Sequence, residues 1–243
     1  MNFKLYKKTL SVIKIVELNY IFAPLLIFNH KLNTFIMTKG RIFLLSILVL
    51  FFYNCEEDNT SPLDVVYSSI EDLHAPQQGG QGQPIAGEFA KFDFETGLST
   101  QSPTEWDIAF RGTAIIVNGG SSLGTTDEPE RTGDAGVYIY DGLMSEMSIV
   151  DTSLFNQDSS EGYAINTGSG NGWYTYAGPP TYLISPTPGK ILVFRTRDGK
   201  FAKLEILSYY LGSPENPDAF ADQSRYYTFN YVYQPNEGVT EFN

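Results

Sequence analysis

Two short segments of this chain carry residue types that hydrolytic enzymes use. Gly120-Ser121-Ser122-Leu123-Gly124 matches the G-x-S-x-G pattern of a nucleophilic serine, and Glu105 and Asp107 are spaced to share one strand face. Such a serine needs a downstream histidine as its base, but both histidines, His30 and His74, precede it. The serine segment is therefore better interpreted as a loop, and the two carboxylates as solvent-exposed or paired with arginine.

Other patterns of catalysis and of metal binding are missing. One cysteine and two histidines exclude a disulfide framework and a Cys-rich zinc site, and there is no phosphate loop or dinucleotide fingerprint. Residues 1–54 hold seven basic residues and one acidic residue, so 9 basic and 27 acidic residues remain in 55–243, a net charge of −18. That charge repels phosphate backbones. The sequence predicts neither an enzyme nor a nucleic-acid-binding protein.

The N-terminal region has the features of an export signal. An apolar run of 12 residues, 42–53, follows Lys39 and Arg41 and is too short to span a bilayer. Cys55 comes just after this run and before acidic residues, which resembles the acylated cysteine of a bacterial lipoprotein. We therefore expect residues 37–54 to be a lipoprotein signal peptide and residues 1–36 to be an upstream extension. The alternative is an N-terminal transmembrane anchor.

The remaining chain divides into a polar segment and a β-rich segment. Residues 55–87 are rich in Asn, Ser, Gln, Gly and Pro, which predicts a flexible tether. From residue 88 onward, β-branched and aromatic runs are bounded by turn formers, and only 141–157 could hold a short helix. We expect residues 88–243 to form an all-β, antiparallel, sandwich-like domain with long loops and at most one or two short helices.

One β-hairpin can be predicted in detail. Asp198-Gly199 is a type I′ turn signal between two apolar runs. Counting back from the turn pairs Val193 with Leu204 and Ile191 with Ile206, so these four residues would form one apolar face.

Several segments together resemble the HmuY family of bacterial haem-binding lipoproteins. They are 106–111 (WDIAFR), 118–122 (NGGSS), 190–210 and 225–231 (RYYTFNY). The resemblance covers roughly residues 88–234, in family order. It implies a lipid-anchored protein of the outer membrane, at the cell surface or extracellular, that captures haem and passes it to a TonB-dependent outer-membrane receptor.

The resemblance also implies two axial ligands of the haem iron, histidines or methionines, from loops in the middle of the domain. His30 would be lost on cleavage and His74 lies in the predicted tether, so a pair of histidines is excluded. Met144 and Met147 are the remaining candidates, but their spacing would place both on one helix face, so one at most would bind a given iron. The alternative is that both are apolar residues that fill gaps under a loop.

A second ligand would then be a tyrosine, another side chain or water. Tyr163, Tyr174 and Tyr176 are near in sequence and are candidate haem contacts. Arg131 is the basic residue of the mid-domain loops and a candidate partner of a haem propionate, the alternative being an exposed, solvated arginine.

Two other functions stay open at this point. The same scaffold could bind a glycan, a peptide or a partner protein through aromatic loops instead of haem. A surface glycoside hydrolase that uses Glu105 and Asp107 is the third hypothesis.

Overall fold

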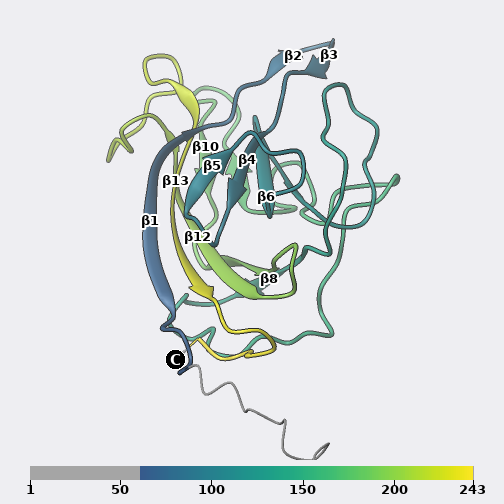
Figure 1. Cartoon of the computed structure of the whole chain (residues 1–243). Helices are drawn as coiled ribbons and strands as arrows, with labels where there is room; N and C mark the ends of the chain where they lie inside the picture. Colours follow the sequence, from purple (N-terminus) through teal and green to yellow (C-terminus); the bar gives the residue numbers. More distant parts are fainter. Residues whose placement is uncertain (1–60, 243) are drawn as a thin grey trace, which may run out of the picture. The chain divides into compact units, whose positions relative to one another are not determined.

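The computed structural model describes residues 61–242, and all regular structure in this range is β-strand. The larger sheet has five strands, in the spatial order β1 (Val66–His74), β13 (Ser224–Gln234), β12 (Phe201–Tyr210), β11 (Lys190–Arg195) and β8 (Gly136–Asp141) (Figure 1). The smaller sheet has four, in the order β5 (Leu98–Thr100), β4 (Ala90–Asp93), β6 (Ile108–Arg111) and β7 (Ala114–Val117). Two ribbons pair β2 (Gln78–Gly80) with β3 (Gln83–Ala86), and β9 (Tyr174–Tyr176) with β10 (Ile184–Pro186).

All of these strand pairs are antiparallel, so the predicted fold class is confirmed. The short helix that 141–157 could hold is not formed, because this segment consists of turns and isolated bridges. Within the described residues, no helix is long and apolar enough to cross a membrane.

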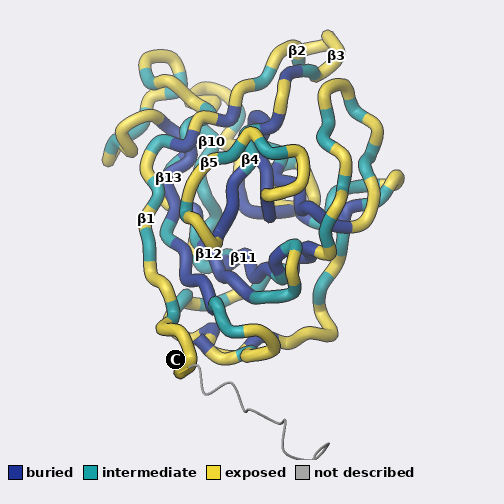
Figure 2. The backbone as a smooth tube through the Cα atoms, viewed as in Figure 1, coloured by how far each residue is buried: buried dark blue, intermediate teal, exposed yellow. Residues whose placement is uncertain are grey.

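The main core consists of aromatic and aliphatic side chains that the two sheets contribute together. Phe92 of β4 meets Phe229 of β13 edge to face, with ring centroids 5.5 Å apart, and Phe94 contacts Phe194 at 5.4 Å. Figure 2 shows that the buried residues are concentrated in the strands of the two sheets, whereas the residues of the connecting loops are mostly exposed. Because successive strand residues point to opposite faces, the alternating apolar residues of the sequence meet in one layer.

The β11–β12 hairpin forms where the sequence predicts it, but its register differs by one residue. The turn contains three residues, 197–199, and Gly199 at its end has a φ of 87°. This corresponds to a three-residue hairpin loop with a left-handed residue in last position. Leu192 therefore pairs with Leu204, and the predicted pairing of Val193 with Leu204 is wrong, as is the rest of that register.

The shifted register changes which side chains share a face. Leu192 and Phe194 point into the core between the sheets, whereas Ile191 and Val193 are buried on the opposite face. Residues from the loop after β8 and from the C-terminal end of the chain cover that opposite face. Since β11 is buried on both sides, its apolar run does not alternate, and a single apolar face cannot be inferred from it.

β1 occupies residues that the sequence assigns to a flexible tether. It pairs with β13 along most of its length, and its last residue, His74, stacks on Tyr226 with ring centroids 4.5 Å apart. The glycine-rich run that follows forms the β2–β3 ribbon. The tether prediction is therefore wrong for residues 66–86, and His74 belongs to the folded part. The predicted signal peptide, the upstream extension and Cys55 lie outside the described residues.

Candidate functional site

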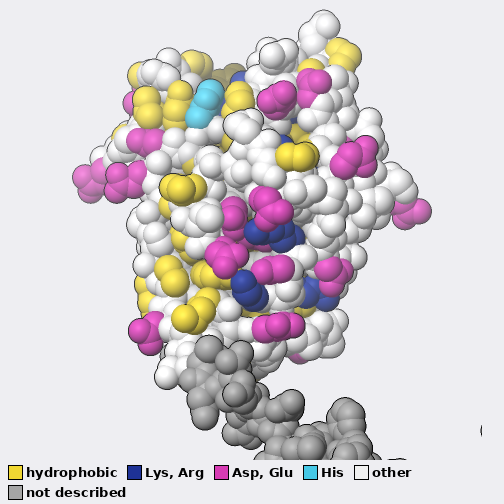
Figure 3. Space-filling model, viewed as in Figure 1, with side chains coloured by type: hydrophobic (Ala, Val, Ile, Leu, Met, Phe, Trp, Pro, Cys, Tyr) yellow, Lys and Arg dark blue, Asp and Glu magenta, His cyan; other side chains and the backbone are white. Residues whose placement is uncertain are grey.

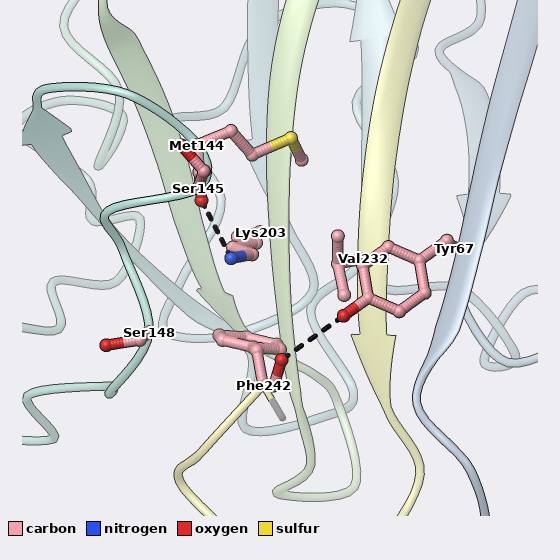
Figure 4. Close-up of a pocket in the computed structure, with 7 residues that line it drawn as sticks. All are labelled: Tyr67, Met144, Ser145, Ser148, Lys203, Val232 and Phe242. Atoms are coloured by element: carbon pink, nitrogen blue, oxygen red, sulfur yellow. Dashed lines mark hydrogen bonds between the residues drawn. The ribbon is translucent and has the colours of Figure 1, made fainter.

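A pocket lies on the face of the five-stranded sheet that the loop after β8 covers. Its volume is about 530 Å³, which is within the range of small-molecule sites. β1, the loop after β8, β12, β13 and the C-terminal segment contribute its lining, which is Tyr67, Met144, Ser145, Ser148, Lys203, Val232 and Phe242 (Figure 4). Tyr67 at its edge is 69% exposed, so the pocket opens to solvent.

The two methionines have different environments. Met144 lines the pocket, whereas Met147 is 3% exposed and packs in a cluster with Val150 and Phe242. A single turn joins them, in which the Met147 N–H donates to the Leu143 carbonyl at 3.3 Å. Met144 therefore brings a thioether to the pocket, and Met147 behaves as the gap-filling apolar residue that the sequence also allowed.

Lys203 is a cation in an apolar part of the sheet. It lies beside Val232 on β13, is 5% exposed, and its Nζ donates to the carbonyls of Met144 (2.8 Å) and Met147 (2.6 Å). The Nζ is also 4.9 Å from the centre of the Phe242 ring. No carboxylate of residues 61–242 forms an ion pair with it, and burial lowers the pKa of this ammonium from its usual value.

Arg131 lies in a buried ion-pair cluster and not in the Met144 pocket. Its Nη2 is 2.7 Å from Glu128 Oε1 and 2.8 Å from Asp158 Oδ2, and its side chain is 1% exposed. The guanidinium also lies 5.8 Å from the centre of the Trp106 ring. Burial raises the pKa of Asp158, although Arg131 and the N–H groups of Ala164 and Val117 favour its ionised form. Arg131 is thus occupied by two carboxylates and holds loop residues against the smaller sheet.

The three tyrosines are not brought together with the methionines either. The Tyr163 hydroxyl lies 3.4 Å from Glu128 Oε2, and this residue lines a second, more polar pocket of about 680 Å³ between two loops. Tyr174 is buried in the main core against Trp173, and Tyr176 is exposed on the β9–β10 ribbon. None of the three lines the Met144 pocket.

The paired carboxylates of the hydrolase hypothesis are bound to an arginine. Asp107 accepts hydrogen bonds from the backbone N–H groups of Phe94 and Arg197, both at 2.9 Å, and lies 3.3 Å from Arg197 Nη1. Glu105 pairs with Arg197 Nη2 at 3.0 Å. Figure 3 shows basic side chains enclosed by acidic ones on the visible face of the protein. The prediction that these carboxylates pair with arginine is confirmed, and Asp107 ties the β11–β12 turn to the smaller sheet.

The protonation of Asp107 should appear in the pH dependence of stability. Burial raises the pKa of Asp107 from 3.8 to about 6. A group whose pKa is higher in the folded state stabilises the fold below its unfolded pKa, and this contribution is lost as the pH rises through the folded value. When the pH falls from neutrality to about 4, the free energy of unfolding of wild type should therefore rise by about 1–3 kcal/mol relative to that of Asp107→Asn. Urea unfolding of both proteins across this window measures the difference. A constant or shrinking difference would mean that the carboxylate stays ionised beside Arg197.

The comparison with protein families identifies the chain. The family described as HmuY protein matches residues 87–231, which is more than half of the chain. The chain belongs to the HmuY family. The resemblance inferred from the sequence motifs is confirmed, and its predicted limits agree with this match to within three residues.

The comparison with solved structures found chains of low sequence identity. The apo HmuY analog of Tannerella forsythia has 11% identity and a TM-score of 0.45, covering 72% of this chain and 100% of that chain. A protein of Bacteroides fragilis described as a lipoprotein has 15% identity and a TM-score of 0.41, with 72% and 94% covered. A protein of Bacteroides vulgatus described as HmuY-like and haem-binding has 13% identity and a TM-score of 0.41, with 72% and 97% covered. Curated proteins provide no match.

The Met144 pocket extends beyond the part of the chain that matches the HmuY family. Met144 and Lys203 lie within residues 87–231, whereas Tyr67, Val232 and Phe242 lie outside. Sequence reasoning missed Lys203 as a site residue, although a lysine inside a strand of apolar residues was a detectable signal. Tyr67 could not be found, because its segment was assigned to the tether.

Histidines and acidic residues of the described part of the chain form no alternative metal site. In residues 61–242, no group of three or more His, Cys, Asp or Glu side chains could hold a metal ion. A haem iron is held by its porphyrin and needs only axial ligands from the protein. Met144 in the pocket and the exposed His74 at the sheet edge are the accessible thioether and imidazole donors of residues 61–242, because Met147 is buried.

Proposed function

We propose that this HmuY-family chain is a lipoprotein that binds haem as cargo and carries out no catalysis. Cys55 would carry the lipid after removal of residues 37–54, and would anchor the protein to the outer membrane at the cell surface. Haem would be captured there, or by a released form, and passed to a TonB-dependent outer-membrane receptor. The observation that carries this proposal is the family match over residues 87–231.

The Met144 pocket supports haem binding by the chemistry of its lining. A thioether is an established axial ligand of haem iron, and Met144 is the side chain of the pocket that provides one. Val232 and Phe242, each 4% exposed, form an apolar floor of the pocket. Tyr67 lies on the opposite side from Met144, and its hydroxyl donates to the Phe242 carbonyl at 3.3 Å (Figure 4). A hydroxyl oxygen from Tyr67, or water, would be the second axial donor.

A haemin titration of residues 56–243 tests this proposal. We expect a Soret band that saturates at a stoichiometric ratio. Met144→Leu removes the sulfur but keeps the volume, so it should shift the band and weaken binding about tenfold or more. Met147→Leu is the matched control, because that side chain is buried outside the pocket lining and should leave the spectrum unchanged.

Other outcomes would redirect the assignment. A band that Met144→Leu leaves unchanged but His74→Ala abolishes would place the iron at the β1–β13 edge instead. A flat titration with both ferric and ferrous haem would refute haem binding. The exposed group of Tyr176, Tyr182 and Phe220 would then be the surface to examine in a non-haem binding module.

A further inference from the structure

The charge of Lys203 is not matched by a carboxylate in residues 61–242, although its Nζ bonds two carbonyls and lies near the Phe242 ring. The residue sits in the middle of β12, and its neighbours across the sheet are Val193 and Val232. An ammonium group taken out of water without an opposite charge is strongly disfavoured, and an apolar side chain at this position would avoid that penalty. The other buried cation without an ion pair in the described residues is Arg111, which donates three hydrogen bonds to surrounding loops and has a buried Nε without a partner.

The Lys203 ammonium has one more N–H donor than it uses within the described part of the protein. An ammonium has three N–H donors, and two of them reach the carbonyls of Met144 and Met147. The third N–H and the positive charge remain at a pocket of about 530 Å³ whose other lining side chains are aromatic, aliphatic, thioether and hydroxyl groups. The two carbonyl bonds hold the Nζ in place, so the donor is preorganised for an acceptor in the pocket; Figure 4 shows the bond to the Met144 carbonyl.

We propose that Lys203 binds a carboxylate of the molecule that occupies this pocket. The ligand is then an amphipathic carboxylate, whose apolar body contacts Val232 and Phe242 and whose acid group reaches the Lys203 Nζ. In identifying this group as a haem propionate, the inference rests on the proposed function. It assigns to Lys203 the role that the sequence had suggested for Arg131, whose guanidinium is already bound by Glu128 and Asp158.

Iron-free porphyrins separate this role from that of Met144. Protoporphyrin IX has two carboxylates, and its dimethyl ester has the same ring without a free acid. Wild type should bind the diacid more tightly than the ester, and Lys203→Met should weaken binding of the diacid roughly 10- to 100-fold while leaving the ester unchanged. Lys200→Met is the matched control: it removes the same charge three residues away, from a lysine that pairs with Asp198, and should affect neither ligand.

Folding of the variant is checked independently. Lys203→Met leaves two carbonyls without their donor. Lys203→Gln removes the charge but keeps an N–H donor, on a side chain that is one atom shorter, and should show the same selective loss of the diacid. Circular dichroism and urea unfolding establish that both variants are folded.

The possible results distinguish the two proposals. If wild type prefers the diacid but Lys203→Met and Lys203→Gln bind it equally well, the carboxylate role is wrong and haem binding stands. If wild type binds neither haemin nor either porphyrin, the proposed function fails, and palmitate becomes the probe. Binding of palmitate that depends on Lys203 would support the carboxylate site without haem, and its absence would overturn that site as well.

Discussion

Replacing Arg131 with methionine should lower the free energy of unfolding by about 3–5 kcal/mol. The guanidinium donates to Asp158 from Nε (3.2 Å) and Nη2 (2.8 Å), to Glu128 at 2.7 Å, and to the Pro129 carbonyl at 2.6 Å. Its removal leaves two carboxylates that are 1% and 0% exposed without a counter-charge. Asp158 in turn accepts hydrogen bonds from the backbone N–H groups of Val117 on β7 and of Ala164, so the loss would spread to the segment that covers the smaller sheet.

The control for this prediction is another arginine in an exposed ion pair. Arg195 is 27% exposed and its partner Asp134 is 68% exposed, so Arg195→Met should change stability by about 1 kcal/mol or less. Urea denaturation, monitored by far-UV circular dichroism, compares the Arg131→Met and Arg195→Met variants. A stable Arg131→Met protein with weakened haemin binding would instead support the role in propionate binding that the sequence suggested.

Replacing Trp173 with alanine should cost about 3–5 kcal/mol of stability, the range for large aromatic residues in cores. The indole is 2% exposed and its ring centroid lies 4.9 Å from that of Tyr174, 5.7 Å from that of Tyr209 and 5.1 Å from that of Tyr227. Its Nε1 also donates to the Thr113 carbonyl at 3.0 Å, which links the β9–β10 ribbon to the smaller sheet. The vacated volume cannot collapse without moving all of these rings.

This prediction also tests whether the aromatic residues near Trp173 are core or binding surface. Tyr176→Ala, three residues away on the same ribbon and 45% exposed, should change stability by less than about 0.5 kcal/mol. Haemin affinity should be unaffected by Trp173→Ala under conditions where the variant is folded, since Trp173 is not part of the Met144 pocket. A well-folded Trp173→Ala protein with unchanged stability and altered haemin binding would show that these rings line a ligand site.

The candidate site was only partly accessible to sequence reasoning. Met144 and Met147 were proposed because the family resemblance implies histidine or methionine ligands, and Met144 lines a pocket. Tyr174 and Arg131 are buried elsewhere, because nearness in sequence does not bring loop side chains to one cavity. The partners of Arg131 illustrate the reason: Asp158 is 27 residues away, and only the packing of two loops makes it a neighbour.

The amino-acid sequence by itself determined the class of the fold, the family and the place of the β11–β12 hairpin. These features depend on local periodicity, turn residues and motif order, which adjacent residues encode. The tertiary structure alone decided the one-residue register of that hairpin, the incorporation of β1 and the burial of Lys203. Val66 of β1 pairs with Tyr233, near the other end of the sequence. Because the partner strand is so remote in sequence, the residues around β1 give little indication that it forms a strand. Lys203 became buried in the same way, because segments distant in sequence close over the face on which it lies.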